Sequence, residues 1–440
     1  MNIAWCHNAV TGGAKRAGQE FVRELSRRGH VIDEFIVADE PIDDYLPLQP
    51  FVRATYRTAL GKPPVPPDLR PYLLETTAAF AYQWFRARMT ERALRQTADR
   101  INHGDYDLVN IDQHPFCWVA GLLPYLRRPA VVYSHEVSMQ RYLTEPVQPT
   151  GAGLRGVYAR WCQAPIAMAR QAKERREANR IRLAPLVLTN SRYSVDLWAQ
   201  RGHDAKLCYY GVDHQLFRPL GLPVEPMVLS VGRLVPAKGH DLVIESIAAL
   251  PPEQRPRVVV ATPETTAVYV RLVDDLRRLA CERQVELQIM FAPEQDELVR
   301  LYNQALAMIF VPQMEPFGLV AIEAMACGTP VIGVREGGLP ESVVDGVTGL
   351  LVERDASQIA AAVQTLRAQP ELRERLGRQA REHIERSWTW ERAVDRYEQM
   401  VREFLGRGAS GSVARPRSEE APASESAAFK KEQNEAGTAR

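Results

Sequence analysis

Short apolar runs alternate along the chain with longer segments in which apolar residues recur every three or four positions. In the first half, the runs predict strands at residues 1–5, 31–37, 108–112, 130–135, 186–191 and 207–210. In the second half, they predict strands at residues 227–232, 257–261, 287–291, 307–312, 330–334 and 349–352. The longer segments, such as QEFVRELSRRGH and HDLVIESIAAL, predict amphipathic helices. Alternating strands and helices indicate an α/β fold with parallel sheets covered by helices.

The two sets of strands are separated by a proline-rich stretch, DHQLFRPLGLPVEP, at residues 213–226. Twelve strands are more than one sheet holds comfortably in a chain of this length, and proline-rich segments are typical of domain boundaries. We therefore expect two doubly wound, Rossmann-like domains, at residues 1–219 and 220–385. Their sheets would face a central cleft, which is the expected ligand site.

Three segments fall outside this alternation. Residues 41–105 form a long insertion, rich in Arg and aromatic residues, that we expect to be helical. Residues 386–407 place Trp390, Val394 and Tyr397 at three- and four-residue spacings, which predicts a helix with one apolar face. Residues 408–440 are rich in Ser, Ala, Glu and Pro and should form a disordered tail.

Charge and cysteine content narrow the class of protein. Residues 1–219 hold 29 Lys and Arg against 22 Asp and Glu, whereas residues 220–440 hold 26 against 32, so the halves should meet different partners. Six cysteines without a Cys-x-x-Cys pair argue against a zinc site or disulfide framework and fit a reducing cytosol. The longest apolar run, residues 115–126, is shorter than the roughly 20 residues that span a bilayer. The chain opens on a predicted strand rather than a signal peptide, so we expect a cytoplasmic protein.

Two cations follow the first predicted strand of the second domain, in SVGRLVPAKGHDLVIESI. The strand ends at Gly232, and Arg233 and Lys238 occupy the loop before a helix that should begin near Gly239. Two cations at the carboxyl end of a strand suit an anion such as a diphosphate. The alternative is that both are solvated surface cations.

Two carboxylates flank an apolar run in EPFGLVAIEAMACGTPVIGVREGGLPE. Glu315 and Glu323 are separated by seven residues, and a helix should begin near Gly318. Glu315 would then precede the helix, and Glu323 would lie on about its second turn. A carboxylate can accept hydrogen bonds from two adjacent hydroxyls of a ribose or hexose. The alternative for Glu323 is an ordinary glutamate in the first turns of a helix.

Together these motifs resemble those of the retaining glycosyltransferases of family 4, which have the two-domain GT-B fold. EPFGLVAIE resembles the Glu-x7-Glu motif of the family, and GRLVPAKG resembles its Gly-Arg-Leu-x3-Lys-Gly segment. YYGVDHQLF resembles its Asn-Gly-Val-Asp connector, with Tyr210 in place of the Asn. EAMACGTPVIGVREGGLPESVVDGVTGLLV resembles the stretch that closes the domain. The resemblance extends from residue 1 to about residue 405.

The resemblance implies roles for the matching residues of the second domain. Arg233 and Lys238 would neutralise the diphosphate of a nucleotide sugar and the charge that develops on the leaving group. Glu323 would bind the ribose hydroxyls, and Glu315 would bind hydroxyls of the donor sugar near the reaction centre. Backbone N–H groups would contact the donor sugar or phosphate at Phe317, Gly318 and Leu319.

The first domain is expected to bind the acceptor. Gly12 and Gly13, in HNAVTGGAKRAGQEF, resemble the Gly-Gly loop that faces the donor phosphate and acceptor in the family. Glycines let a backbone approach a ligand closely. His135 resembles a histidine that the family places at a strand end, where it would contact acceptor or donor sugar. His114 is similarly placed. For both, the alternative is a structural histidine.

Two departures from the family leave the donor nucleobase open. The family has Gly-x-Gly after the second strand of its second domain, whereas this chain has VVVATPETTAVYV. Where the family has a Phe-x-Gly turn, this chain has IMFAPEQDEL. Both loops lie near the base in the family, so a UDP-hexose and a GDP-hexose both remain candidates.

Arginine-rich segments raise the question of a membrane. A basic run covers residues 155–182, and residues 51–60 and 79–95 place aromatic residues beside arginines. Such segments can bind an anionic membrane surface, which would make the protein peripheral on the inner face of the membrane. The alternative is a solvated basic helix face. We do not expect nucleic-acid binding, because no recognition fold accompanies the charge.

The implied activity is a retaining hexosyltransfer from a nucleotide sugar to a glycan or lipid-linked acceptor, in cell-surface polysaccharide or glycolipid synthesis. We expect no cofactor and no metal, because no Asp-x-Asp motif serves as a diphosphate anchor. The final helix would cross back to the first domain, anchored by Trp390 and Tyr397. The main alternative is a GT-B nucleotide-sugar epimerase. A dinucleotide-binding oxidoreductase lacks its G-x-G-x-x-G here, and a non-catalytic assembly protein would not need the charged residues of the site.

Overall fold

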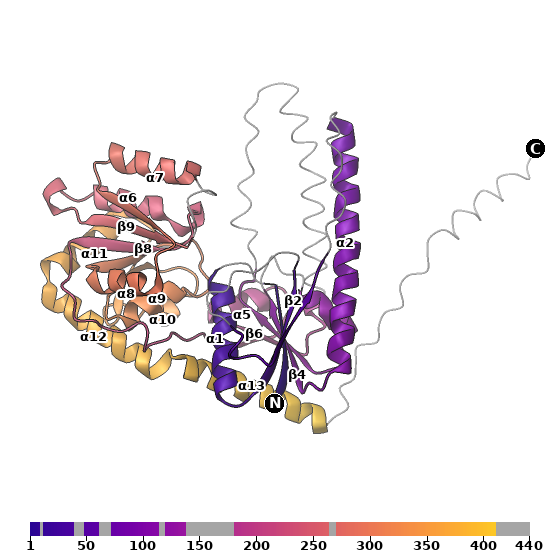
Figure 1. Ribbon diagram of the computed structural model, residues 1–440. Helices are drawn as coiled ribbons and strands as arrows, with labels where there is room; N and C mark the ends of the chain where they lie inside the picture. Colours follow the sequence, from indigo (N-terminus) through magenta and orange to yellow (C-terminus); the bar gives the residue numbers. More distant parts are fainter. Residues whose placement is uncertain are drawn as a thin grey trace, which may run out of the picture. The chain divides into compact units, whose positions relative to one another are not determined.

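The computed structural model describes residues 1–8, 12–38, 48–60, 72–113, 119–137, 180–263 and 270–410, without the side chains of residues 72–87 and 408–410. Residues 1–399 form one compact unit, and residues 400–440 belong to a second. The first unit holds two parallel sheets with helices around them (Figure 1). This is the two-domain, doubly wound α/β architecture that the alternation of strands and helices predicts.

The first sheet has seven parallel strands in the order β3-β2-β1-β4-β5-β6-β7. The strands are β1 (Asn2–His7), β2 (Val31–Val37), β3 (Ala54–Thr58), β4 (Leu108–Gln113), β5 (Ala130–Ser134), β6 (Leu186–Thr189) and β7 (Ala205–Leu207). The helical elements around them are α1 (Gly13–Arg27), α2 (Tyr72–His103), η1 (Val119–Tyr125) and α5 (Arg192–Ala199). The strand order reverses direction between β1 and β4, which is where open α/β sheets bind ligands at their carboxyl ends.

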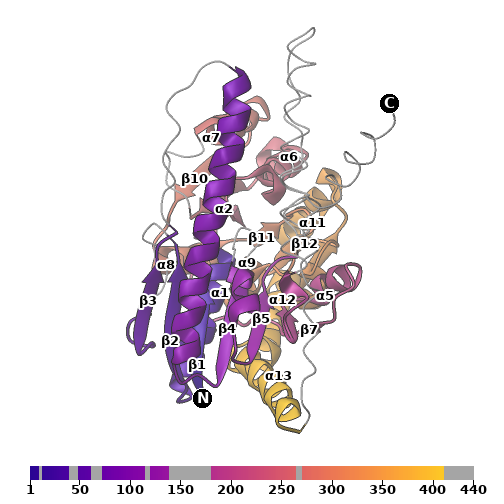
Figure 2. The ribbon, with the colours of Figure 1, turned by 90° about the vertical axis from the view of Figure 1, so that its right-hand side faces the viewer.

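Side chains of the central strands alternate between two buried faces. On β1, Ala4 and Cys6 join the apolar cluster that includes Leu94 and Ala98 of α2. Trp5 points to the other face, where its ring lies 6.4 Å from that of Phe21 on α1. Figure 2 shows α2 lying along the sheet in front of β1 and β2. Because both faces are covered, nearly every position of β1, β2 and β4 is buried, including polar residues such as Asn110 and Asp112.

The second sheet has six parallel strands in the order β10-β9-β8-β11-β12-β13. The strands are β8 (Met227–Val231), β9 (Arg257–Thr262), β10 (Leu287–Phe291), β11 (Ala307–Phe310), β12 (Val331–Val334) and β13 (Gly349–Val352). The helices are η2 (Pro236–Lys238), α6 (His240–Ala248), η3 (Pro252–Gln254), α7 (Val270–Glu282), α8 (Gln295–Gln304), α9 (Leu319–Ala326), α10 (Leu339–Ser342), α11 (Ala356–Ala368) and α12 (Pro370–Ser387). One core cluster joins this sheet to α6, α7 and α11.

All twelve predicted strands are present, and most of them end within two residues of the predicted bounds. The exception is the last strand of the first sheet, predicted at 207–210, which lies at Ala205–Leu207. The expectation that residues 41–105 are helical is wrong in part. Their described portion contains the edge strand β3 as well as α2. Tyr56 of β3 stacks on Phe35 of β2, and Thr55 donates a hydrogen bond to Glu34, which explains why this segment pairs as a strand.

The final helix, α13 (Trp390–Ser410), begins after α12 has ended at Ser387. Its first turns pack against the first sheet. The ring of Trp390 lies 5.4 Å from that of Phe21, and the hydroxyl of the fully buried Tyr397 donates a 2.9 Å hydrogen bond to Asn110 on β4. The start of the final helix therefore lies against α1 and the first sheet. The helix continues to Ser410, so the predicted tail boundary at residue 408 falls inside it, and residues 411–440 lie outside the described part.

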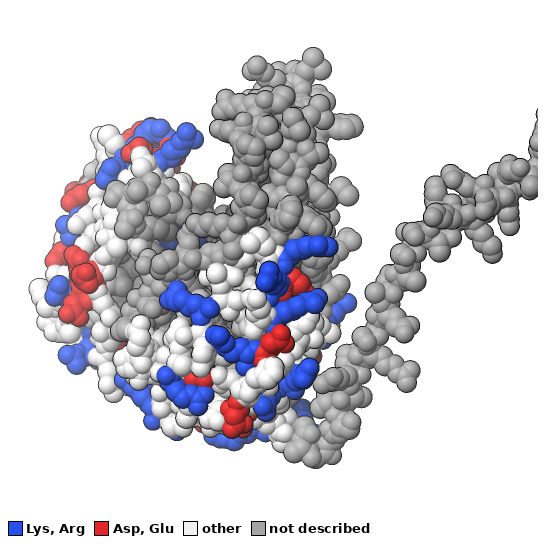
Figure 3. All heavy atoms as spheres, turned by 45° about the vertical axis from the view of Figure 1, so that its right-hand side comes forward, with Lys and Arg blue, Asp and Glu red and all other residues white. Residues whose placement is uncertain are grey.

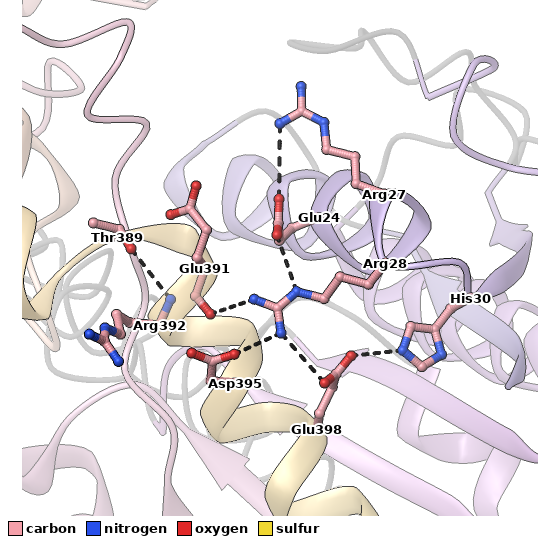
Figure 4. A network of polar contacts seen from close by, with 9 residues as sticks. All are labelled: Glu24, Arg27, Arg28, His30, Thr389, Glu391, Arg392, Asp395 and Glu398. Carbon is pink, nitrogen blue, oxygen red and sulfur yellow. Dashed lines mark hydrogen bonds and ion pairs between the residues drawn. The ribbon is translucent and has the colours of Figure 1, made fainter.

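A network of polar contacts connects the end of α1 to the start of α13 (Figure 4). Arg28, just after α1, lies at its centre and donates to Glu24, to Asp395 and to the backbone carbonyl of Glu391. His30 lies 2.8 Å from Glu398. These contacts hold the start of α13 against the end of α1 through both ion pairs and a backbone acceptor.

Candidate functional site

The loop after β8 carries the two predicted cations, and a buried histidine holds it in place. His240, in the first turn of α6, lies 2.9 Å from the hydroxyl of Ser230 through Nδ1 and 3.2 Å from the carbonyl oxygen of Arg233 through Nε2. Burial lowers the pKa of His240 to about 4, so the ring is neutral at pH 7. Its Nε2–H therefore donates to the Arg233 carbonyl, and Nδ1 accepts from Ser230.

Glu315 meets this loop across the carboxyl end of the sheet. The Nζ atom of Lys238 lies 2.7 Å from Oε2 of Glu315, and both side chains are about one-fifth exposed. The backbone carbonyl of Glu315 accepts a 2.8 Å hydrogen bond from the N–H of Gly338. A Cβ on Gly337 would come within 2.2 Å of that carbonyl oxygen, so the Gly-Gly loop allows this close approach. The structure thus brings together two residues that lie 77 positions apart.

An arginine outside the predicted set supports the segment before Glu315. Arg354 donates to the carbonyl oxygens of Val311 and Pro312 and forms a two-pronged ion pair with Glu336. These contacts tie the end of β13 to the start of the loop that carries Glu315. Sequence reasoning missed Arg354, because nothing in the local pattern around it marks its distant partners.

The start of α9 lies where the resemblance predicts it. Gly318 has a φ of 91°, and a Cβ there would meet the ring of Phe310 at 2.8 Å, so this helix start requires glycine. The side chain of Phe317 is buried, 4.9 Å from the ring of Tyr210 and 5.6 Å from that of Trp388. Phe317 can therefore serve a ligand only through its backbone.

The first turns of α1 and α9 adjoin. A Cβ on Gly13 would lie 3.4 Å from the Cδ1 atom of Leu319. Gly12, the residue before α1, has a φ of 152°. Two helix N-termini that meet in this way direct unpaired N–H groups and positive dipole ends toward the same region. That arrangement is compatible with a phosphate at Gly12, Gly13 and Leu319. This contact remains a prediction.

Glu323 is buried, and each of its carboxylate oxygens has a partner. Its Oε1 atom lies 2.8 Å from Arg16 on α1, and its Oε2 atom accepts a 2.9 Å hydrogen bond from the hydroxyl of Tyr302 on α8. Burial raises the pKa of the Glu323 carboxyl, whereas Arg16 and Tyr302 act to lower it. Each carboxylate oxygen keeps further lone-pair capacity, so a ribose would share Glu323 with these two residues. The ribose-binding role of Glu323 remains a prediction.

His135 also has both ring nitrogens engaged. Nε2 contacts Asp112 of β4, and Nδ1 contacts the hydroxyl of Tyr210. The backbone carbonyl of His135 accepts a 2.8 Å hydrogen bond from Asn190. The residue is 4% exposed, and this geometry favours the structural alternative over a direct sugar contact. Tyr210, which replaces the family's Asn, is one of its two ring partners. His114 lies outside the described residues.

Glu136 is a charged residue of the site that sequence reasoning missed. It follows His135 just beyond the carboxyl end of β5 and is half-buried. Burial and the nearby carboxylate of Glu315 raise the pKa of Glu136 to about 7, while Lys238 and Arg233 act to lower it. His135 was a candidate because it lies at the carboxyl end of a strand, and Glu136 lies one residue further on. The same sequence feature could therefore have identified Glu136.

Some of the arginines in and near the predicted basic segments make contacts within the fold. Arg180 pairs with Glu91 of α2 at 2.9 Å, and Arg100 lies over the ring of Tyr56 at 4.9 Å. Figure 3 shows Lys and Arg side chains outnumbering Asp and Glu on the face that it presents. Most of the basic run at residues 155–182 lies outside the described residues. Membrane binding therefore remains a prediction. No helix in the described ranges is long and apolar enough to cross a bilayer.

The described residues offer no preformed metal site. Within the part of the chain that the structure describes, no three His, Cys, Asp or Glu side chains are grouped to hold a metal ion. Asp105 and Asp107 have Asp-x-Asp spacing, but they precede β4 at its amino end, where Asp107 accepts a hydrogen bond from the N–H of Asn2. Metal independence remains a prediction.

The sequence matches to known proteins include the region of the second sheet. The family model of glycosyl transferases group 1 matches residues 214–383, which contain the Arg233 loop and both glutamates of the Glu-x7-Glu motif. The D-inositol 3-phosphate glycosyltransferase of Saccharomonospora viridis is 37% identical over 223 residues, covering 46% of this chain and 52% of the relative. That of Acidothermus cellulolyticus is 36% identical over 233 residues, covering 49% and 51%. The chain thus spans about half the length of the curated relatives it matches.

Similar solved structures cover the chain more fully. Sucrose-phosphate synthase from Thermosynechococcus elongatus has a TM-score of 0.68 at 22% identity and covers 92% of this chain and 100% of its own. Anabaena HepE in complex with UDP-glucose has a TM-score of 0.65 at 18% identity, with the same coverage of both chains. At these identities the likeness shows the fold, and the fold of this chain is GT-B.

Proposed function

We propose that this chain, whose residues 214–383 form a group 1 glycosyl transferase domain, transfers a hexose from a nucleotide-diphosphate sugar to a glycan or lipid-linked acceptor. The transfer retains the anomeric configuration of the sugar. The chain acts in the cytoplasm, on acceptors that lead to cell-surface polysaccharide or glycolipid. The observation that carries the proposal is the meeting of Lys238 and Glu315, 2.7 Å apart, beside the adjoining starts of α1 and α9.

The charges of this site suit a nucleotide sugar. Arg233 and Lys238 would bind the diphosphate and stabilise the charge that develops on it as the glycosidic bond breaks. Glu315 would pass from its ion pair with Lys238 to hydroxyls of the donor sugar, once the diphosphate takes over the lysine. Glu323 lies on α9, where Arg16 and Tyr302 hold it, and would bind the ribose hydroxyls.

Retention follows from attack on the face that the leaving group occupies. In that reaction the departing phosphate accepts the proton of the acceptor hydroxyl, so a separate protein base is not required. The ring of His135, already engaged by Asp112 and Tyr210, would then support the site rather than move a proton.

The relatives suggest which donors to test first. HepE has been solved with UDP-glucose, which favours a UDP-hexose as the first donor. The D-inositol 3-phosphate glycosyltransferases match less than half of this chain, so their acceptor is not carried over. The acceptor remains the broader class of glycan or lipid-linked glycan.

Thermal stability in the presence of donors tests the proposal. A ligand that binds only the folded protein stabilises it by RT ln(1 + [L]/Kd), which is about 2.7 kcal/mol at one hundred times Kd. UDP-glucose, UDP-N-acetylglucosamine, GDP-mannose and ADP-glucose form the panel. We expect one nucleotide class to raise Tm, and Lys238→Ala to reduce the rise. A chain that responds to none of the four is not the proposed transferase.

Incubation with the bound donor alone distinguishes transfer from epimerisation. A transferase leaves the sugar configuration of its donor unchanged and gives at most slow hydrolysis. Conversion of the donor into an epimeric nucleotide sugar, without any acceptor, would instead establish the epimerase alternative.

A further inference from the structure

The α10 loop, residues 337–342 of the second domain, reaches the start of α5 in the first domain through Glu341. The Oε2 atom of Glu341 accepts a 2.8 Å hydrogen bond from the backbone N–H of Arg192, and its Oε1 atom accepts a 2.9 Å bond from that of Tyr193. The hydroxyl of Tyr209 donates a further 2.7 Å hydrogen bond to Oε2. One carboxylate thus joins a helix start and a tyrosine that lie 132 to 149 positions earlier in the chain.

The local cap of α5 satisfies only part of its first turn, and Glu341 adds two acceptors. The first N–H groups of a helix have no partner within that helix. Ser191, the residue before α5, accepts a 3.0 Å hydrogen bond through its hydroxyl from the N–H of Ser194. Glu341 accepts from the two N–H groups before it, Arg192 and Tyr193, and its negative charge is favourable at a helix N-terminus. The first turn of α5 is therefore completed by a residue of the other domain.

Tyr209, the third partner of Glu341, is itself held where the two domains are joined. Its ring lies 4.8 Å from that of Trp388, in the short link between α12 and α13, and the guanidinium carbon of Arg396 lies 5.6 Å from its centroid. Arg396 also donates a 3.3 Å hydrogen bond to the backbone carbonyl of Tyr209. Glu341 therefore meets a fixed point of the first domain rather than a mobile surface side chain.

The other end of the α10 loop fixes the segment that carries Glu315. The N–H of Gly338 donates a 2.8 Å hydrogen bond to the backbone carbonyl of Glu315. A Cβ on Gly338 would lie 2.0 Å from the carbonyl oxygen of Pro316 and 3.0 Å from the Cβ of Ser191, so the loop passes closely between the two segments. Because Gly338 and Glu341 belong to one short loop, a shift of Glu341 away from α5 would move Gly338 and the backbone of Glu315 with it.

We propose that Glu341 is a positioning residue for sugar transfer, which sets the position of Glu315 by fastening the α10 loop to the first domain. The inference rests on the proposed function, because it takes Glu315 as the group that binds hydroxyls of the donor sugar. Glu341 contacts no part of the donor in this proposal and acts only through Gly338 and the backbone of Glu315.

Loss of Glu341 should therefore affect binding of the sugar and not of the nucleotide. Under the proposed function, UDP binds through Arg233, Lys238 and Glu323, whereas Glu315 contacts only the sugar. We expect Glu341→Ala to leave the Kd of UDP within about twofold and to raise the ratio of the Kd of UDP-glucose to that of UDP by about tenfold, the effect of losing one hydrogen bond to a charged group.

Isothermal titration calorimetry with UDP and with UDP-glucose measures this ratio. If the donor panel selects another nucleotide, its nucleoside diphosphate and nucleotide sugar replace this pair. Ser191→Ala is the matched control, because it removes the local cap of the same helix from within the first domain and keeps the Cβ. It should lower Tm and leave the ratio unchanged. Tyr209→Phe and Glu341→Gln each remove part of the contact, so they should raise the ratio by less than Glu341→Ala does.

Amide hydrogen exchange in the unliganded protein checks the contact itself. Glu341→Ala should speed exchange in the peptide that contains Arg192 and Tyr193, because their N–H groups lose an acceptor. It should also speed exchange in the peptide that contains Gly338, because the loop is no longer fastened to α5. Ser191→Ala should speed exchange only in the first of these peptides.

Three outcomes would overturn the inference while leaving the proposed function intact. The first is an unchanged ratio of the two Kd values in Glu341→Ala, and the second is an equal rise of that ratio in Ser191→Ala. The third is faster exchange at α5 alone, since Gly338 would then be independent of Glu341. If Glu341→Ala does not fold, Glu341→Gln and Tyr209→Phe decide, and an unchanged ratio in both refutes the inference.

Absence of binding by any panel member to the wild type is a different result, because it refutes the proposed function itself. The exchange measurements need no ligand, so they still test whether Glu341 holds Gly338 in that case.

Discussion

At the residue scale, the charged groups of this site are held by partners that lie far away in the sequence. Lys238 reaches Glu315, and Glu323 reaches both Arg16 and Tyr302. Buried or partly buried charges are stable only when they are paired and hydrogen-bonded. In the unliganded protein these pairs hold the side chains in place, and a donor would exchange some of the contacts rather than create them.

Removing either cation should impair turnover strongly. We expect Arg233→Ala and Lys238→Ala each to lower kcat/KM by about 100-fold or more, by analogy with loss of one donor from an oxyanion site. Steady-state kinetics with the donor identified by the panel measure this. Lys206→Ala removes a half-exposed surface lysine that pairs with Asp204, and it should leave kcat/KM unchanged. Near-normal activity in both site variants would reduce Arg233 and Lys238 to surface charges.

Buried His240 should make stability depend on pH. Its pKa is about 4 in the folded state, against an ordinary value of 6.5, because burial disfavours the charged ring. Between these values the unfolded chain binds a proton that the folded protein does not. The stabilising effect of neutral His240 is therefore complete above about pH 6.5 and is lost as pH falls, by up to about 1.4 kcal/mol per pH unit.

Urea unfolding at several pH values checks this expectation for His240. His240→Gln keeps an amide near the position of Nε2 but does not titrate, so its free energy of unfolding should fall less than that of wild type between pH 6.5 and 4.5. Because other groups also titrate in this range, the difference between the two proteins is the informative quantity. Parallel curves for the two proteins would contradict the assignment.

At the element scale, loops at strand ends depend on side chains from neighbouring strands and helices. The segment between β11 and α9 carries Glu315, and it is held by Arg354 from the end of β13 and by the Gly337-Gly338 loop. Val311 and Phe317 are buried near the two ends of this segment. Between them, hydrogen bonds to the backbone carbonyls of Pro312 and Glu315 help to fix its position.

Arg354→Ala should displace that loop. The change leaves the carbonyls of Val311 and Pro312 without their donor and Glu336 without its ion pair. We expect the free energy of unfolding to fall by about 2–4 kcal/mol and kcat/KM to fall by about tenfold, since Arg354 acts only through the position of Glu315.

Two further variants separate the geometry of Arg354 from its charge. Arg354→Lys keeps the charge but not the planar fork, so it should recover less than half of the lost stability. Arg335→Ala removes a more exposed arginine that pairs with Asp345, and it should cost less than about 1 kcal/mol. Equal effects of Arg354→Ala and Arg335→Ala would show that the contacts of Arg354 are not special.

Gly18 on α1 should respond to Ala in the opposite sense from an ordinary helical glycine. Gly→Ala in a helix interior usually stabilises by about 0.5–1 kcal/mol. A Cβ on Gly18, however, would lie 2.2 Å from Oδ2 of Asp112, which contacts His135 through its other oxygen. We expect Gly18→Ala to lower Tm, whereas Gly406→Ala on α13, where a Cβ would meet nothing within 4 Å, should not. A Tm for Gly18→Ala at or above that of wild type would refute the close approach.

At the scale of the whole molecule, α12 and α13 run consecutively from one sheet to the other. α12 contacts β13 and α9 of the second sheet, and the start of α13 packs on β1, β4 and α1 of the first. The only residues between them are Trp388 and Thr389. Trp388 lies against Phe317, and Thr389 pairs with Val212 in an isolated parallel bridge. This short connection joins α12, which packs on α9 and β13, to the first domain.

Tyr397→Ala should therefore affect turnover more than nucleotide binding. Truncation of such a buried aromatic residue costs about 3–5 kcal/mol, and it loosens the contact that joins α13 to the first sheet. Under the proposed function the second domain binds the donor, so donor affinity should change little, whereas kcat should require both domains in place. Tyr397→Phe removes only the hydrogen bond to Asn110 and should cost about 1 kcal/mol. If turnover is unchanged, or if both quantities fall only because the protein melts, Tyr397 is an ordinary core residue.

Much of this architecture follows from local patterns in the sequence. Apolar runs of four to seven residues mark the strands because both faces of each sheet are buried, and the glycines at 239 and 318 mark helix starts that need a left-handed backbone. β3 was missed because an edge strand with one exposed side chain in two lacks the continuous apolar run of its neighbours. Its pairing depends on contacts with β2, which lies about twenty residues earlier in the chain.

The sequence by itself determined the α/β class, the two-domain division, the positions of Arg233, Lys238, Glu315 and Glu323 in their elements, and the amphipathic final helix. These properties depend on residues within one or two turns of each other, so local periodicity and motif spacing contain them. Only the tertiary structure decided which charges are partners: Arg16 with Glu323, Lys238 with Glu315, and His135 with Asp112 and Tyr210. The physical reason is that charge pairing acts through distance in space, and the crossovers of a parallel sheet bring strand ends together that the chain separates by tens to hundreds of residues.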